Sequence, residues 1–173
     1  MEKRSVRHLA AVLKLLVDIT LVCNVVAIFL VPMLARQRYV DLWLYQELLW
    51  DDSLVWQDPR AVVLMVFLWF CGCCTAVILW QGRRVLGTIL RGEPFSMENA
   101  VSLRRAAVCA FLIAAAALAR VIWGVCYYRS ANPLATYNAL FVPIFAMAGL
   151  LCLVMSALFH QAAEMKAEND LTI

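Results

Sequence analysis

The sequence predicts an all-α integral membrane bundle of four transmembrane helices. Of the 173 residues, 65% are hydrophobic and 16% are charged, and the mean hydropathy is +0.81. Soluble domains contain about 25% charged residues. Four separate segments exceed the roughly 18 apolar residues that indicate a membrane-spanning helix. Because these spans leave no room for a soluble domain, residues 1–173 are expected to form one domain, with spans at residues 9–34, 61–80, 106–128 and 139–159.

The first apolar segment is expected to be retained as a helix. Lys3, Arg4 and Arg7 precede it, as basic residues precede the apolar part of a secretory signal. Its apolar part is longer than that of a signal peptide, and residues 32–35 lack the small-x-small pattern of a cleavage site. We therefore interpret residues 9–34 as a membrane anchor.

Lysine and arginine are distributed unequally between the loops, which predicts the orientation. The N-terminal flank and the loop at residues 81–105 hold Lys3, Arg4, Arg7, Lys14, Arg83, Arg84, Arg91, Arg104 and Arg105. The opposite side holds Arg36, Arg38, Arg60 and Arg129. The positive-inside rule then places both termini, the loop at 81–105 and the tail at 160–173 in the cytoplasm. Since topology accounts for these cations, direct nucleic-acid binding is not expected.

The outer loop, residues 35–60, mixes acidic and aromatic side chains. Aromatic residues favour the headgroup zone of a bilayer, and this loop contains Tyr39, Trp43, Tyr45, Trp50 and Trp56. One interpretation is a short helix along the outer leaflet. The other is a lid that senses a ligand or binds a partner, and the sequence does not separate the two.

Three polar residues fall inside the predicted spans: Asp18 and Asn24 in the first and Arg120 in the third. A charge at the centre of the bilayer costs about 2.5–3.5 kcal/mol on insertion scales, so these groups should face other helices or reach the interface. At 1.5 Å per residue, Asp18 lies roughly 14 Å and Arg120 roughly 21 Å from the cytoplasmic ends of their helices. One hypothesis is an Asp18–Arg120 ion pair, with Asn24 as a further partner. The alternative is that Arg120 extends toward the interface while Asp18 finds a hydroxyl group or water.

All seven cysteines lie in the apolar segments. Cys71 and Cys74 have the C-x-x-C spacing, which is found in membrane thiol oxidoreductases. Those enzymes also use a cysteine pair at the outer surface, and the outer loop has none. Packing is the simpler interpretation, because small residues also recur at four-residue spacing, as in Ala106, Ala110 and Ala114.

The sequence lacks the motifs of common catalytic sites. It contains no H-E-x-x-H, no G-x-S-x-G and no glycine-rich phosphate loop. We therefore expect no enzymatic activity, no cofactor and no metal site. A small transporter or channel subunit is a further alternative, but it would require a homo-oligomer that encloses a polar path past Asp18, Asn24 and Arg120.

The loop at residues 81–105 has a detailed local pattern. Val85, Leu86, Ile89 and Leu90 are apolar at helical spacing, so the second helix is expected to continue beyond the membrane with its arginines outward. Gly92 and Pro94 then end it. Ser96 is placed to cap the third helix, with Glu98 in its first turn. Phe95 could pack back near Ala100 as a hydrophobic staple.

Two segments carry a family resemblance, G-E-P-F-S-M-E-N-A-V-S-L-R-R in the loop and E-N-D-L-T-I at Glu168 to Ile173. They resemble an uncharacterised bacterial family of four-span membrane proteins, domain of unknown function 2975. The matching positions are Pro94, Phe95, Ser96, Asn99, Leu103 and Arg104, together with Leu171, Thr172 and Ile173. The resemblance implies a bacterial plasma-membrane protein, and an association with small helix-turn-helix regulators.

The expected function is therefore that of a small sensor, regulatory or scaffolding protein in the lipid bilayer. Its cytoplasmic loop and tail would contact a protein partner such as a helix-turn-helix regulator. Glu164, Glu168 and Asp170 make the tail acidic, on the same side as the arginine-rich loop. Thiol oxidoreduction through Cys71 and Cys74 is the main competing function.

Overall fold

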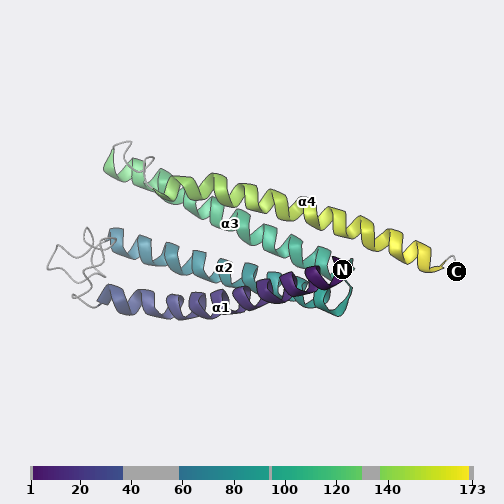
Figure 1. Cartoon of the computed structure of the whole chain (residues 1–173). Coiled ribbons are helices and arrows are strands. Elements are labelled where there is room, and N and C mark those ends of the chain that lie inside the picture. The colour runs from purple at the N-terminus through teal and green to yellow at the C-terminus, as the bar shows by residue number, and fades with distance from the viewer. Residues whose placement is uncertain (1, 37–58, 94, 130–136, 172–173) are drawn as a thin grey trace.

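The chain folds into four long helices. The computed structural model describes residues 2–36, 59–93, 95–129 and 137–171. The helices are α1 (Glu2–Arg36), α2 (Pro59–Arg91), α3 (Met97–Tyr128) and α4 (Tyr137–Leu171) (Figure 1). Each contains a stretch long and apolar enough to cross a membrane. The predicted fold class, an all-helical multi-pass membrane protein, is confirmed. The aromatic part of the outer loop lies outside the described residues.

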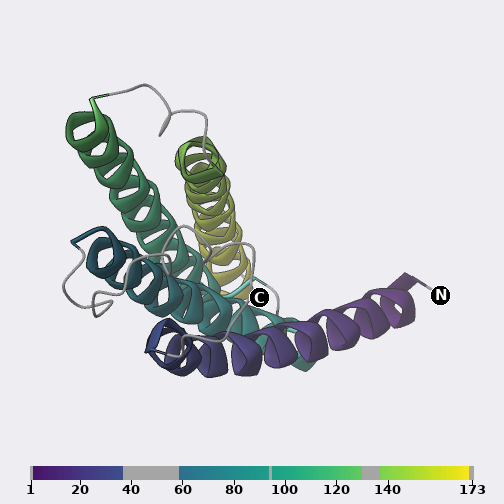
Figure 2. The same ribbon diagram turned by 90° about the vertical axis from the view of Figure 1, so that its left-hand side faces the viewer.

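The helices pack in sequence order. Within the described ranges, α1 packs against α2, α2 against α3 and α3 against α4, and no other pair of helices is in contact. Successive helices are antiparallel, so both ends of the chain lie at the same end of the bundle as the turn between α2 and α3 (Figure 1). Viewed along the bundle, α1 and α4 lie at the two ends of a bent row (Figure 2). We call the end with the α2–α3 turn the hairpin end.

Small side chains form the core around α3. Ala107 and Ala117 are fully buried, and Ala106, Ala110 and Ala114 are nearly so. Small residues let helix backbones approach closely where water cannot drive their association. The packing role predicted for Ala106, Ala110 and Ala114 is confirmed by their burial.

A second close approach joins α3 to α4. A Cβ atom at Gly149 of α4 would lie 3.0 Å from two ring carbons of Phe111. On the outer faces, apolar side chains are exposed from Leu9 to Leu30 of α1 and from Leu140 to Met165 of α4. A continuous apolar surface of this kind requires lipid around it.

The helices are longer than a bilayer requires. Hydrocarbon about 30 Å thick is crossed by roughly 20 helical residues, whereas α2 has 33 and α4 has 35. The extra length of α2 is the predicted amphipathic extension, because Val85 and Leu86 are buried while Arg83, Arg84 and Arg91 are exposed. The bilayer therefore leaves helical structure projecting at the hairpin end.

Candidate functional site

The turn at the end of α2 is built by local backbone chemistry. Gly92 has a φ of 89°, in the left-handed region that glycine adopts without strain. Its amide nitrogen lies 3.1 Å from the carbonyl oxygen of Ile89, and that of Glu93 lies 3.1 Å from the carbonyl oxygen of Thr88. These hydrogen bonds satisfy carbonyl groups at the helix end. The predicted stop of α2 at Gly92 is confirmed.

The first turn of α3 is capped by Ser96. This residue is extended, with φ −120° and ψ 146°, and its hydroxyl group accepts a hydrogen bond from the amide of Asn99 at 3.4 Å. Glu98 lies in the first turn, where a carboxylate meets the positive end of the helix dipole. Its carboxylate also forms an ion pair with Arg84 of α2. The predicted Ser96 cap is confirmed, and the Arg84–Glu98 pair is a link that the sequence did not reveal.

A buried polar contact joins the last part of α2 to the first turn of α3. The hydroxyl oxygen of Thr88 lies 2.8 Å from the side-chain oxygen of Asn99 and 2.7 Å from the carbonyl oxygen of Val85. Thr88 is 3% exposed and Asn99 is 0% exposed. Buried polar groups stabilise a fold only when they are hydrogen-bonded. This contact therefore fixes the two helices in one register.

The turn is also attached to α4. The rings of Phe95 and Phe159 are 5.8 Å apart between centroids and inclined at 52°, a favourable separation for an aromatic pair. One turn earlier in α4, the hydroxyl group of Ser156 donates to the carbonyl oxygen of Ala100 at 2.7 Å. The sequence suggested that Phe95 packs near Ala100, whereas the ring contact that the structure shows is with Phe159. α2, α3 and α4 are thus joined at the hairpin end.

Helix α4 continues beyond this junction. After Phe159 it remains helical to Leu171 and projects past the α2–α3 turn (Figure 1). His160 and Glu164 face each other one turn apart, with Nδ1 and Oε2 separated by 3.4 Å. Met165 is 63% exposed. The segment predicted as a tail is therefore a continuous helix that offers charged and apolar side chains.

The residues of the family resemblance have different environments. Asn99 is buried, Leu103 is half-buried, and Phe95, Ser96 and Arg104 are exposed or partly so. Pro94, Thr172 and Ile173 lie outside the described residues. The structure brings Phe95, Ser96 and Asn99 together around the start of α3, and it gives Arg104 an outward position.

Asp18 does not pair with Arg120. Its Oδ1 lies 2.8 Å from Nε of Arg83 on α2, and α1 does not reach α3 within the described part of the chain. The pairing hypothesis was wrong because it assumed adjacent first and third helices. The contact is an ion pair rather than a hydrogen bond, since Oδ1 of Asp18 is buried without a well-oriented donor.

The other two polar residues of the predicted spans, Asn24 and Arg120, lie apart from this pair. The guanidinium carbon of Arg120 lies 4.8 Å from the ring centroid of Phe67 on α2, within cation–π range. The side-chain oxygen of Asn24 is buried without a hydrogen bond. Asp18, Asn24 and Arg120 therefore do not form one polar cluster.

The cysteines are distributed over all four helices. All seven lie in described residues, and each is a free thiol. Cys74 is buried, Cys71 is partly buried and Cys73 is exposed. The C-x-x-C segment thus turns its last thiol into the bundle, which agrees with the packing interpretation.

Comparisons with known proteins give one match. A sequence model of the family described as "Protein of unknown function (DUF2975)" matches residues 32–173. No curated protein and no solved structure matches the chain. The match covers three of the four helices in full, including the turn and the projecting part of α4.

Proposed function

Because the chain belongs to the DUF2975 family of proteins of unknown function, we propose a role from the geometry of the hairpin end. The protein is a small, non-enzymatic regulatory or sensor protein. It binds a cytoplasmic protein through the turn between α2 and α3 and through the projecting end of α4. The membrane helices anchor this binding surface and couple it to the bilayer.

The projecting part of α4 carries this proposal. The helix extends about 18 Å beyond Phe159, at 1.5 Å per residue. An isolated segment of this length is marginally stable as a helix in water, but here it continues a helix that packs on α3. Charged and apolar side chains, Glu164, Met165 and Glu168 among them, are exposed along it. Such a preformed helix suits recognition by a partner, because little ordering is needed on binding.

The contacts at the hairpin end supply a route from the membrane to that surface. Phe95 connects the turn to α4 and Ser156 connects α4 to the first residues of α3, while Thr88 with Asn99 connects α3 to α2. A change in how α3 and α4 pack would therefore move the projecting helix relative to the turn. A partner that binds one arrangement more tightly would shift the population toward it.

The proposal places the hairpin end in the cytoplasm of a bacterial cell. The excess of lysine and arginine at this end supports that orientation. Fusions after Ile173 test it: a green fluorescent protein should fluoresce, and an alkaline phosphatase, which folds only outside the cytoplasm, should be inactive. The reverse result, active phosphatase without fluorescence, would contradict the orientation.

A small helix-turn-helix regulator is the partner that we propose. Its DNA-binding face is basic, and Glu164 and Glu168 present acidic groups on α4. Binding there would hold the regulator at the membrane and compete with DNA. The association implied by the family resemblance supports the same partner.

The test is co-purification of the full-length chain with the proposed helix-turn-helix regulator. A chain truncated after Gln161 keeps Ser156 and Phe159 but should lose the regulator. Glu164→Gln with Glu168→Gln should weaken retention, whereas Lys166→Gln, the matched control on the same exposed helix, should not. Equal retention by the truncated and full-length chains would contradict the proposal.

A further inference from the structure

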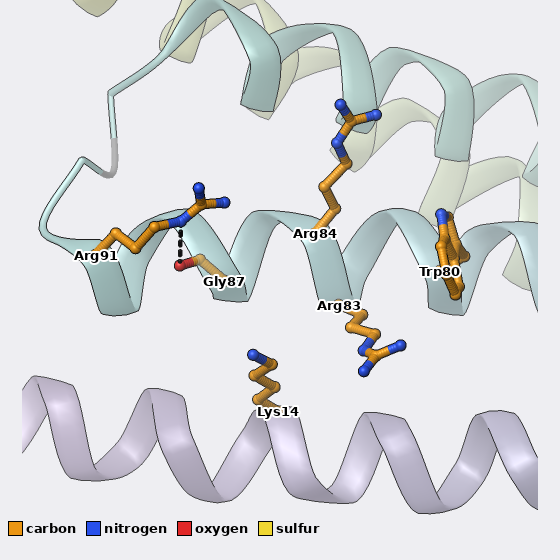
Figure 3. A pocket seen from close by; sticks show the side chains of 6 residues that line it. All are labelled: Lys14, Trp80, Arg83, Arg84, Gly87 and Arg91. Carbon is orange, nitrogen blue, oxygen red and sulfur yellow. Dashed lines mark hydrogen bonds between the residues drawn. The ribbon is translucent and has the colours of Figure 1, made fainter.

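A basic groove lies between α1 and α2 near the hairpin end. It has a volume of about 410 Å³ and is lined by Lys14, Trp80, Arg83, Arg84, Gly87 and Arg91. Figure 3 shows Lys14 pointing from α1 toward α2, and Arg83 pointing from α2 toward α1. The guanidinium group of Arg83 also lies 5.5 Å from the ring centroid of Trp80. Four cations therefore line one groove.

Only part of this charge is compensated. Arg83 pairs with Asp18, and Arg84 pairs with Glu98. Within the described residues, Lys14 has no carboxylate partner, and Arg91 donates to the carbonyl oxygen of Gly87, at 3.4 Å, on its own helix. Lys14 and Arg91 can therefore bind an anionic ligand in this groove.

The groove lies at the depth of lipid headgroups. About 20 helical residues cross the hydrocarbon. In α2 we assign this part to the uninterrupted apolar stretch at residues 61–80. Trp80 then marks the boundary, where tryptophan is enriched. Arg83 and Arg84 lie about one turn beyond it, in the zone that contains phosphate groups, and Arg91, two turns farther out, turns its side chain back to the carbonyl oxygen of Gly87 at 3.4 Å.

A shallow, open apolar groove on the surface of α1 begins at Asp18, next to the basic groove. It has a volume of about 300 Å³ and is lined by Asp18, Ile19, Val22 and Cys23. Asp18 joins the two grooves, because its carboxylate contacts Arg83 of the basic groove. Ile19 and Val22 are more than half exposed. A ligand with a phosphate group and an acyl chain would fit both grooves together, whereas inorganic phosphate would use only the first.

We propose that the two grooves form a binding site for one anionic phospholipid. Its phosphate group lies among Lys14, Arg83 and Arg91, and one acyl chain lies along Ile19 and Val22. Basic pockets between membrane helices bind anionic headgroups in this way. The lipid site borders the turn proposed for the protein partner at Arg91, but its lipid binding does not depend on that partner.

Native mass spectrometry of the delipidated full-length protein in detergent tests the site. Phosphatidylglycerol and phosphatidylcholine with identical acyl chains are titrated separately, so that only the headgroup charge differs. Because a neutral detergent has no charged membrane surface, any preference for phosphatidylglycerol over phosphatidylcholine must come from the site. Each cation contributes about fivefold in affinity. We expect phosphatidylglycerol to bind at least about tenfold more tightly to its first site.

The variant Lys14→Gln with Arg91→Gln should weaken phosphatidylglycerol binding on the order of 25-fold. Neither change removes an ion pair, and Lys14→Arg with Arg91→Lys should retain binding. The matched control is Arg104→Gln with Arg105→Gln, which removes the same charge from exposed positions outside the groove and should leave binding unchanged. Equal affinity for the two lipids, or equal losses in both glutamine variants, would overturn the proposal. Displacement of the lipid by millimolar inorganic phosphate would also overturn it, because the headgroup anion alone would then be the ligand.

Discussion

The hydroxyl oxygen of Thr88 and the side-chain oxygen of Asn99 lie 2.8 Å apart inside the protein, one at the end of α2 and the other at the start of α3. Thr88→Val keeps the shape of the side chain and removes the donor. Losing a buried hydrogen bond costs about 0.5–1.5 kcal/mol, and more if an acceptor is left unsatisfied. Thermal unfolding in detergent, followed by circular dichroism, should show this loss, while Thr88→Ser should restore most of the stability. A Thr88→Val protein as stable as the parent would show that the contact has no structural role.

Gly149 permits the close packing of α3 and α4. Because a Cβ atom at this position would lie 3.0 Å from two ring carbons of Phe111, overpacking by Gly149→Ala should cost about 1–3 kcal/mol, of which the gain in helix propensity offsets about 0.5–1 kcal/mol. Phe111→Leu in the same chain should recover part of that loss, since the smaller side chain makes room. Gly82→Ala is the matched control: a Cβ atom there would meet nothing within 4 Å, so it should stabilise α2 by about 0.5–1 kcal/mol. Equal effects at the two glycines would contradict the packing argument.

The partner of Asp18 can be identified by double-mutant cycles. Asp18→Asn combined with Arg83→Gln should depart from additivity by more than about 0.5 kcal/mol, because the two groups are in contact. Asp18→Asn combined with Arg120→Gln should be additive, since α1 does not pack against α3 in the described structure. The free energy of unfolding in detergent supplies both values. Coupling to Arg120 and not to Arg83 would restore the original pairing hypothesis.

The sequence predicted correctly those features that depend on residues close together in the chain. Apolar length predicted the four helices because every backbone polar group in a bilayer must be satisfied within a helix. Gly92 and Ser96 were identified because stop and cap chemistry depend on neighbouring residues. The burial of Ala106, Ala110 and Ala114 followed from their four-residue spacing.

Partners on other helices were harder to predict. Depth in the membrane suggested Arg120 for Asp18, but depth alone does not say which helices are adjacent, and α1 packs on α2. Phe95 lies against Phe159, 64 residues later in the chain, and no local signal links them. Thr88 and Asn99 lie at equal distances from the centre of the turn, so the sequence places them at the same level of an antiparallel helix pair, but it does not show that both side chains face inward.

The proposed contact between the projecting end of α4 and a protein partner can be tested directly. A photo-crosslinking amino acid at Met165 tests it in living cells, with Leu151, an equally exposed position on the lipid-facing part of the same helix, as the control. We expect a crosslink from position 165 to the helix-turn-helix regulator and none from position 151. A crosslink from position 151 to the regulator would contradict the proposed contact. The absence of a crosslink from position 165, while the regulator still co-purifies with the protein, would also contradict it.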